Sequence, residues 1–302
     1  DTDRSRGLGD VYKRQSMSFP NKVLKQDFLS EQDKRDLLFG IENDVDFVAA
    51  SFVSRKQDLV DLNAFLRANG GEDISVIAKI ENQPGIDNIE EIFTECAGIM
   101  IARGDMGVEV PYEELPSIQK ELIGKCRLLG KRVITATEML ESMTHNIRPT
   151  RAEISDVANA IYDGTSAIML SGETAAGDYP VEALKTMSAI AERTENEEHY
   201  RAQRHAEIQI SVSDATAHAA CLTAKDVNAA AIVTVSESGN TARLLSKYRP
   251  KQPIIACVMD EQVQRQLSLS WGITSLLMGP AHSTDELIEM STALAEKNGY
   301  LH

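Results

Sequence analysis

The stretch VIAKIENQPG, residues 76–85, is the most informative part of the sequence, because a run of apolar residues ends there abruptly in charge. The run belongs to a buried strand that we predict over 74–80. Side chains two residues apart on a strand share one face, so Lys79 and Glu81 point the same way at the end of this strand. From the residues alone, the two form either part of a functional site or a surface salt bridge at the start of a loop.

A second apolar run, GIMIA at 98–102, is also followed by charge, at Arg103 and Asp105. Two carboxylates and an ammonium group at the ends of adjacent strands can hold a hard divalent cation and steady a phosphate beside it. The two stretches together therefore predict a functional site of this kind.

Strand-like and helix-like segments alternate around these two stretches. Strands are predicted at 46–52, 74–80, 98–102, 132–136 and 166–170. This spacing suits βα units that build a parallel sheet, and it is compatible with both a doubly wound sheet and a (βα)8 barrel. The barrel is favoured because polar residues stand at or just past the ends of five successive strands, and these ends form one catalytic face in a barrel. Those residues are Ser51, Lys79, Glu81, Arg103, Asp105, Thr137 and Ser171.

A second, smaller α/β unit is predicted in the C-terminal part of the chain. Its strands are expected at 229–235, 253–258 and 273–277. Its last helix begins with Ser283 and Glu286 in a capping-box pattern. We place the barrel unit at 17–199 and the smaller α/β domain at 200–302. Residues 1–16 are polar, without a strand or helix period, and are interpreted as a disordered leader outside the fold.

The composition is that of an ordinary globular protein, with 42% hydrophobic and 25% charged residues in a chain of 302. A net charge of −15 and an isoelectric point near 4.9 argue against nucleic-acid and anionic-membrane partners, which need a basic surface. Four scattered cysteines indicate reduced, buried thiols in a cytoplasmic protein. No apolar run approaches the roughly 18 residues of a membrane span.

Several long motifs together resemble the pyruvate kinase family. They are IAKIENQPGIDNIEEI (77–92), GIMIARGDMGVEVP (98–111), KRVITATEMLESM (131–143), RPTRAEISDVANAIYDGTSAIMLSGETAAGDYP (148–180) and SKYRPKQPIIA (246–256). The resemblance begins near Phe19 and implies a partial (βα)8 TIM barrel, comprising strands four to eight, followed by a smaller α/β effector-binding domain. It also implies that three barrel strands and a lid domain are absent, so we expect an incomplete and inactive fragment.

The activity that the resemblance implies is transfer of a phosphoryl group from phosphoenolpyruvate to ADP, giving pyruvate and ATP in glycolysis. The implied cofactor is Mg²⁺ or Mn²⁺, with K⁺ held mostly by residues outside this chain. A homotetramer is implied for the full-length protein. Two alternatives stay open, namely a Mg²⁺-dependent carbon–carbon lyase of the phosphoenolpyruvate- and pyruvate-binding barrels, and a non-catalytic assembly partner.

The resemblance also implies roles for individual residues. Glu81 and Asp105 match the metal ligands, and Lys79 matches the lysine that stabilises the phosphoryl group in transfer. Thr137 matches a threonine in a hydroxyl and water route that protonates the enolate, and Ser171 would extend that route. Capping of the loops that follow them is the alternative for both. The substrate-binding residues implied are Ser51, Ala102, Arg103, Gly104, Asp105 and Thr137.

Two acidic residues depart from the pattern expected for the family. Glu138 stands where many relatives are expected to have glutamine. Glu237 lies within a loop that matches an effector-phosphate site, where it would repel an anion, so a plain helix-capping turn is an equal alternative. The loop residues are Ser236, Ser238, Gly239, Asn240 and Thr241.

Overall fold

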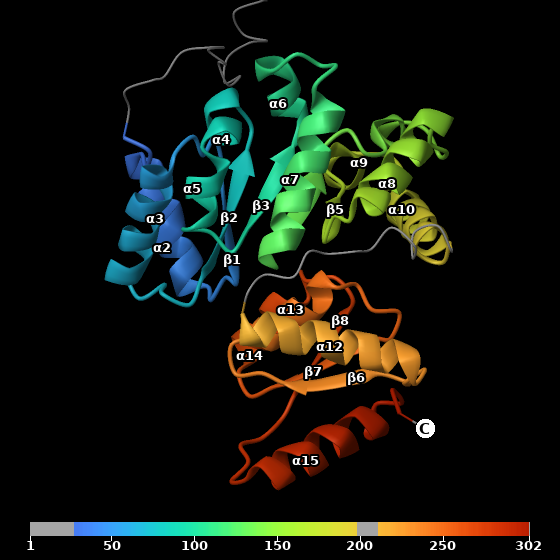
Figure 1. Ribbon diagram of the computed structural model, residues 1–302. Helices are drawn as coiled ribbons and strands as arrows, with labels where there is room; N and C mark the ends of the chain where they lie inside the picture. The colour runs from blue at the N-terminus through green and yellow to red at the C-terminus, as the bar shows by residue number, and fades with distance from the viewer. Residues whose placement is uncertain (1–26, 198–210, 302) are drawn as a thin grey trace, which may run out of the picture.

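Two parallel sheets, each flanked by helices, form the two units of the computed structural model, which describes residues 27–197 and 211–301 (Figure 1). The expected leader at 1–16 lies outside the described residues, as does the expected domain boundary at 199/200. Among the described residues, no helix has the length and apolar composition needed to cross a bilayer.

The larger sheet contains the five strands that the sequence predicts for the first unit. They are β1 (Phe47–Ala50), β2 (Ser75–Ile80), β3 (Gly98–Ala102), β4 (Arg132–Ala136) and β5 (Ala167–Met169). All neighbouring strands are parallel, and their order in the sheet is their order in the sequence. A doubly wound sheet reverses its order at a switch point, so this sequential order confirms the predicted barrel segment.

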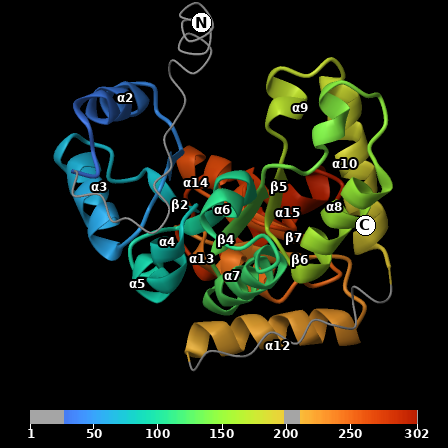
Figure 2. The same cartoon turned by 90° about the horizontal axis from the view of Figure 1, so that it is seen from above.

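Helices follow the strands and cover one face of this sheet. They are α2 (Glu31–Glu42), α3 (Lys56–Ala68), α4 (Gln83–Asp87), α5 (Ile89–Phe93), α6 (Arg103–Glu109), α7 (Leu115–Leu129), η1 (Glu141–Thr144), α8 (Arg151–Asp163), α9 (Gly172–Ala175) and α10 (Pro180–Glu195). Figure 2 shows the longer ones, α2, α3, α7, α8 and α10, in an arc around the strands. Alternate strand residues such as Val76, Ala78 and Ile80 face this helical layer and share one core with Leu62 of α3 and Leu122 of α7.

The opposite face of the sheet carries the candidate site. Ile77, Met100, Ile134 and Ala136 form a separate apolar cluster on this face. Because Lys79 alternates with the residues buried under the helices, it lies on the same face as Ile77. We call this the interior face of the sheet.

The smaller unit contains a three-stranded parallel sheet in the order β6 (Ile232–Val235), β7 (Ile254–Val258) and β8 (Ile273–Leu277). Its helices are α12 (Val212–Asp226), α13 (Asn240–Lys247), α14 (Glu261–Leu267) and α15 (Thr284–Lys297). The predicted capping box of the last helix is only half correct. The Ser283 hydroxyl accepts the Glu286 N–H at 3.1 Å, but the Glu286 carboxylate accepts the N–H of His282.

The two units contact each other at the end of the larger sheet where its strands begin. Arg265 of α14 pairs with Asp44 and Asp46, which precede β1. Arg249 donates to the carbonyls of Gly164 and Thr165, just before β5. The smaller unit therefore lies opposite the strand ends that carry the candidate site.

Candidate active site

Lys79 and Glu81 meet at the end of β2, as the two-residue period predicts. The Lys79 Nζ atom lies 2.7 Å from Glu81 Oε1 and donates a hydrogen bond of 3.0 Å to Ser51 Oγ. The Glu81 side chain is fully buried, whereas the Lys79 side chain is 23% exposed. The two residues therefore do form a salt bridge, but not a surface one, because the carboxylate of the pair is buried.

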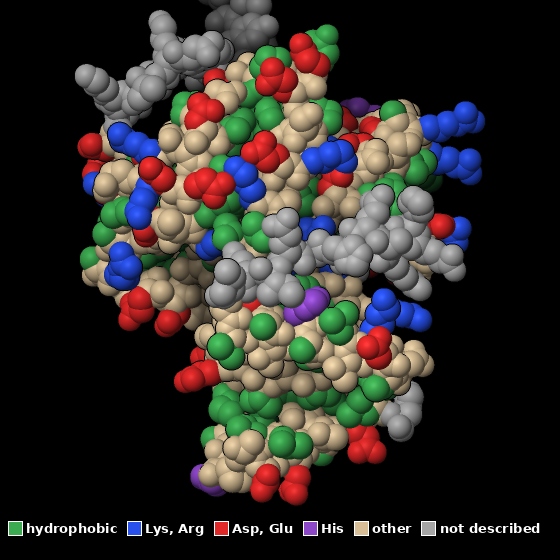
Figure 3. Space-filling view, viewed as in Figure 1, with side chains coloured by type: hydrophobic (Ala, Val, Ile, Leu, Met, Phe, Trp, Pro, Cys, Tyr) green, Lys and Arg blue, Asp and Glu red, His purple; other side chains and the backbone are tan. Residues whose placement is uncertain are grey.

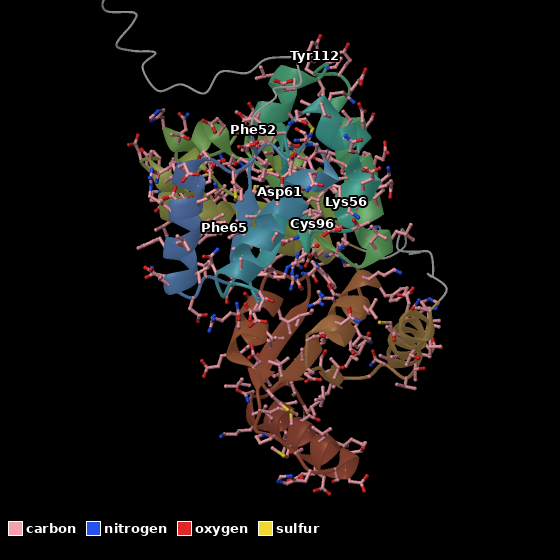
Figure 4. All side chains as sticks on the ribbon, turned by 90° about the vertical axis from the view of Figure 1, so that its left-hand side faces the viewer. Phe52, Lys56, Asp61, Phe65, Cys96 and Tyr112 are labelled. Carbon is pink, nitrogen blue, oxygen red and sulfur yellow. The ribbon has the colours of Figure 1, made fainter. Side chains whose placement is uncertain are left out.

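The chain turn after β1 supplies a further partner for this carboxylate. The backbone N–H of Phe52 donates to Glu81 Oε2 at 2.6 Å. Phe52 has a φ of 54°, a left-handed conformation that is uncommon for a bulky residue and that aims its N–H at the carboxylate. Figure 4 labels Phe52 in the half of the larger unit that lies away from the smaller unit. Glu81 Oε1 accepts no well-aligned hydrogen bond from any described residue, although it contacts the ammonium.

Asp105 follows the end of the neighbouring strand, β3. It lies in the first turn of α6, which begins directly after β3, and its side chain is exposed. The register pairs Ile80 with Ile101, so Glu81 is level with Ala102. No group of three or more His, Cys, Asp or Glu side chains suited to a metal ion occurs among the described residues. Two protein carboxylates nevertheless suit Mg²⁺, which keeps several ligand positions for water and substrate.

Arg103 has a structural role that the sequence does not reveal. Its guanidinium donates to the carbonyl of Thr137 at 2.7 Å and to that of Glu138 at 3.0 Å, and it pairs with Asp156 of α8 at 2.8 Å. These contacts turn it toward a cavity between α7 and α8. Its side chain therefore holds the loop after β4.

Thr137 and Gly104 connect the ends of two neighbouring strands. The Gly104 N–H donates to Thr137 Oγ1 at 2.8 Å, and this hydroxyl donates to the Ala136 carbonyl at 2.6 Å. Thr137 and Glu138 both have positive φ angles, of 68° and 54°. The hydroxyl caps α6, which follows the neighbouring strand, instead of the loop that follows Thr137 itself.

Ser171 follows β5, and its hydroxyl oxygen is buried without a hydrogen-bond partner among the described residues. Its backbone N–H donates to Glu173 Oε2 at 2.7 Å, and Glu173 Oε1 accepts the Leu140 N–H at 2.9 Å. The sequence analysis missed Glu173, which is fully buried. The available signal was an acidic residue in the first turn of α9, four residues after the end of β5.

The candidate effector loop lies in the smaller unit, far along the chain from these residues. Gly239 precedes α13 with a φ of 73°, and a Cβ there would come within 2.9 Å of Leu267. α13 begins without a side-chain cap, and Arg243 donates to the Ser238 carbonyl at 3.0 Å. Glu237 is exposed in this turn. Phosphate binding by the loop stays a prediction.

The cysteines are buried, as the composition predicts. Acidic and basic side chains are interspersed over the face shown in Figure 3. Cys96, Cys126, Cys221 and Cys257 are all free and buried. Burial raises the pKa of each thiol, that of Cys221 to about 12, so the thiols stay protonated at neutral pH.

Two family models match the chain. The one described as "Pyruvate kinase, barrel domain" matches residues 3–184, and the one described as "Pyruvate kinase, alpha/beta domain" matches residues 214–302.

Individual relatives are similar over nearly the whole chain. A pyruvate kinase of Clostridium acetobutylicum is 48% identical over 296 residues, which cover 97% of this chain and 63% of the relative. One of Geobacillus stearothermophilus is 48% identical over 96% of this chain and 50% of the relative. The crystal structure of a pyruvate kinase from Cryptosporidium parvum matches with a TM-score of 0.89 and 39% identity, covering 94% of this chain and 60% of that one. The chain therefore spans less than two thirds of the length of these relatives.

Proposed function

Since the chain belongs to the pyruvate kinase family, we propose that its larger unit serves phosphoryl transfer from phosphoenolpyruvate to ADP, giving pyruvate and ATP. The observation that carries this proposal is the ammonium of Lys79 on the interior face, between Ser51 Oγ and the buried carboxylate of Glu81. An ammonium fixed at this position can stabilise the negative charge that is spread over the phosphoryl oxygens in the transition state.

Glu81 and Asp105 would hold Mg²⁺ or Mn²⁺. The fit rests on the buried Glu81 Oε1, which lacks a well-aligned donor, and on the exposed Asp105 carboxylate, for which no described residue supplies a partner. A divalent ion bound there would supply positive charge for the phosphoryl oxygens. Because Lys79 Nζ lies 2.7 Å from Glu81 Oε1, it would move away from that oxygen when a cation is bound, and Ser51 can retain it.

The substrate would lie over the ends of β3 and β4. The backbone of 102–105 supports a carboxylate-binding role, although the Gly104 N–H already donates to Thr137. The Thr137 hydroxyl donates to the Ala136 carbonyl, so it would have to reorient before it could pass a proton toward the enolate. The buried Ser171 Oγ has no hydrogen-bond partner in the described part of the chain, so it can accept a hydrogen bond from such a proton route.

Further properties of the family complete the proposal. We assign K⁺ as a second cation. We also assign a homotetramer to the full-length protein and the cytoplasm as its location. The support is the similarity to curated pyruvate kinases and the acidic, mixed-charge composition.

A chimaera tests the proposed activity on a protein of full family length. This chain replaces the matching residues of the Clostridium acetobutylicum relative, and pyruvate release from phosphoenolpyruvate and ADP is followed with Mg²⁺ present. We expect turnover that falls at least ~100-fold in Glu81→Gln. Glu141→Gln, an exposed site in η1, is the matched control and should leave turnover unchanged. A folded chimaera that cleaves a carbon–carbon bond of an aldol substrate but releases no pyruvate would contradict the proposal.

Metal binding can be measured on the 302-residue chain itself. Electron paramagnetic resonance of added Mn²⁺ should show bound ion, with weaker binding in Glu81→Gln and Asp105→Asn but not in Glu141→Gln. Equal Mn²⁺ binding in all variants would remove Glu81 and Asp105 as ligands, whether or not the chimaera is active.

A further inference from the structure

A cleft at the junction of the two units is lined almost entirely by basic and hydroxyl side chains. It encloses about 250 Å³ of unfilled space, part of which is open to solvent. Figure 1 shows α13 on the side of the smaller unit that faces the larger one. The residues around the cleft are Gly130, Lys131, Arg132, Ser166, Arg243, Ser246, Lys247, Ser270 and Trp271.

Two of these residues are arginines for which no described residue supplies a carboxylate. Arg132 begins β4 and is only 3% exposed, and Arg243 lies half-buried in α13. Neither belongs to any of the ion pairs found among residues 27–197 and 211–301, whereas Lys247 in the same wall is paired with Asp214 at 2.8 Å. A buried charge is costly unless an opposite charge compensates it.

The electrostatics of the cleft support this description. Burial is the main cause that lowers the pKa of Arg132 to about 10, and repulsion from Arg243 is the lesser cause. Burial alone lowers the pKa of Arg243. Both guanidinium groups are still charged at neutral pH. Two positive charges therefore repel each other at a site that is partly shielded from solvent.

After the hydrogen bonds within the cleft are formed, more donors than acceptors remain unused. Arg132 donates from Nε to Ser270 Oγ and from Nη2 to the Gln266 carbonyl. Its Nη1 has no acceptor among the described residues. Arg243 uses only Nη1, on the Ser238 carbonyl. The hydroxyls of Ser270 and Ser166 accept hydrogen bonds, from Arg132 and from the Val133 N–H, so each keeps its own hydrogen to donate.

We propose that this cleft binds a tetrahedral oxyanion of the phosphate class, held by Arg132 from the larger unit and Arg243 from the smaller unit. Guanidinium groups bind phosphate through paired N–H donors, and the two serine hydroxyls complete an all-donor surface. The part of the cleft that a water molecule can enter is only about 20 Å³, far below the roughly 300–1,000 Å³ of a drug-sized ligand site. It therefore suits inorganic phosphate or the phosphate group of a small ester. The bound anion would join the two units, because its main ligands come from both.

Fluorescence of Trp271 provides a direct test, because Trp271 lines the cleft and is the only tryptophan of the chain. Inorganic phosphate is titrated into the 302-residue chain at constant ionic strength, with chloride as the balancing anion, and glycerol phosphate is titrated in parallel. We expect a saturable change in emission with phosphate. Saturation by glycerol phosphate as well identifies an ester site, and saturation by phosphate alone identifies a site for the free ion.

Variants separate a specific site from general screening of charge. Arg243→Gln should weaken phosphate binding at least about tenfold, and Arg243→Lys, which keeps the charge but loses the paired donors, should weaken it less. The control is Arg67→Gln, an exposed cation at the end of α3 that should bind phosphate like the parent chain. Line broadening of the phosphate ³¹P resonance gives a second measurement that does not depend on Trp271. A linear response equal to that of chloride, or unchanged binding in Arg243→Gln, overturns the proposal.

Discussion

Replacing Glu173 by glutamine should loosen the connection between the ends of β4 and β5. The buried Glu173 carboxylate accepts the N–H of Leu140 at 2.9 Å and that of Ser171 at 2.7 Å. Leu140 belongs to the loop that starts at Thr137, so one side chain ties together two segments of the candidate site. The substitution therefore tests a contact that positions the site without touching the proposed metal ligands.

The expected magnitude follows from the number of lost acceptors. A glutamine amide has one acceptor oxygen, so it can keep one of the two N–H groups while its NH₂ group faces the other donor. A buried N–H left without an acceptor costs about 1–3 kcal/mol, and we expect this loss in the free energy of unfolding for Glu173→Gln. Glu173→Ala removes both acceptors and should cost about 2–6 kcal/mol.

Urea unfolding followed by far-ultraviolet circular dichroism measures these losses. Glu141→Gln serves as the matched control, because Glu141 is exposed in the neighbouring η1 helix. It should stay within about 0.5 kcal/mol of the parent chain. If Glu173→Ala is as stable as this control, the two hydrogen bonds do not hold the site together and the reasoning is refuted.

Three further predictions concern other parts of the fold. Burial raises the pKa of Glu153, but hydrogen bonds from Ser142 and Thr150 outweigh it and lower the pKa below 4.5. The stabilisation is therefore present above pH 4.5 and lost as the pH falls through the lowered pKa. In Glu153→Gln, the free energy of unfolding in urea should thus depend less on pH in this range. Parallel curves of this free energy against pH for the variant and the parent chain would contradict this. No thiol should react with Ellman's reagent at pH 8 until the chain unfolds, and rapid labelling of any native thiol would be contrary evidence. Arg249→Met should shift Trp271 emission, because the guanidinium lies 4.6 Å from the ring centroid; an unchanged spectrum would speak against this packing.

The centre of the larger sheet could be predicted from the sequence because β3 and β4 are buried on both faces. Continuous apolar runs mark such strands, and the runs at 98–102 and 132–136 coincide with β3 and β4. The prediction for β1 extended to residue 52, but the strand ends at Ala50. Phe52 then adopts a positive φ and donates its N–H to Glu81, an interaction between distant residues that local pattern does not encode.

The candidate site could be predicted only in part, for the same physical reason. The period of two along β2 places Lys79 and Glu81 on one face, and the structure confirms that they meet. The roles of Arg103 and Glu173 depend on hydrogen bonds to loops more than thirty residues away in the chain. No spacing within either motif indicates these partners, so only the folded structure reveals which side chains position the site.

We propose that Lys79 acts on charge that develops during phosphoryl transfer, and the kcat of the chimaera carrying Lys79→Met measures this effect. Lys56→Met is the matched control, since Lys56 forms an ion pair with Glu95 away from the strand ends. The account predicts that Lys79→Met lowers kcat at least ~100-fold, whereas the dissociation constant for phosphoenolpyruvate changes less than ~tenfold. An unchanged kcat together with lost phosphoenolpyruvate binding would contradict it.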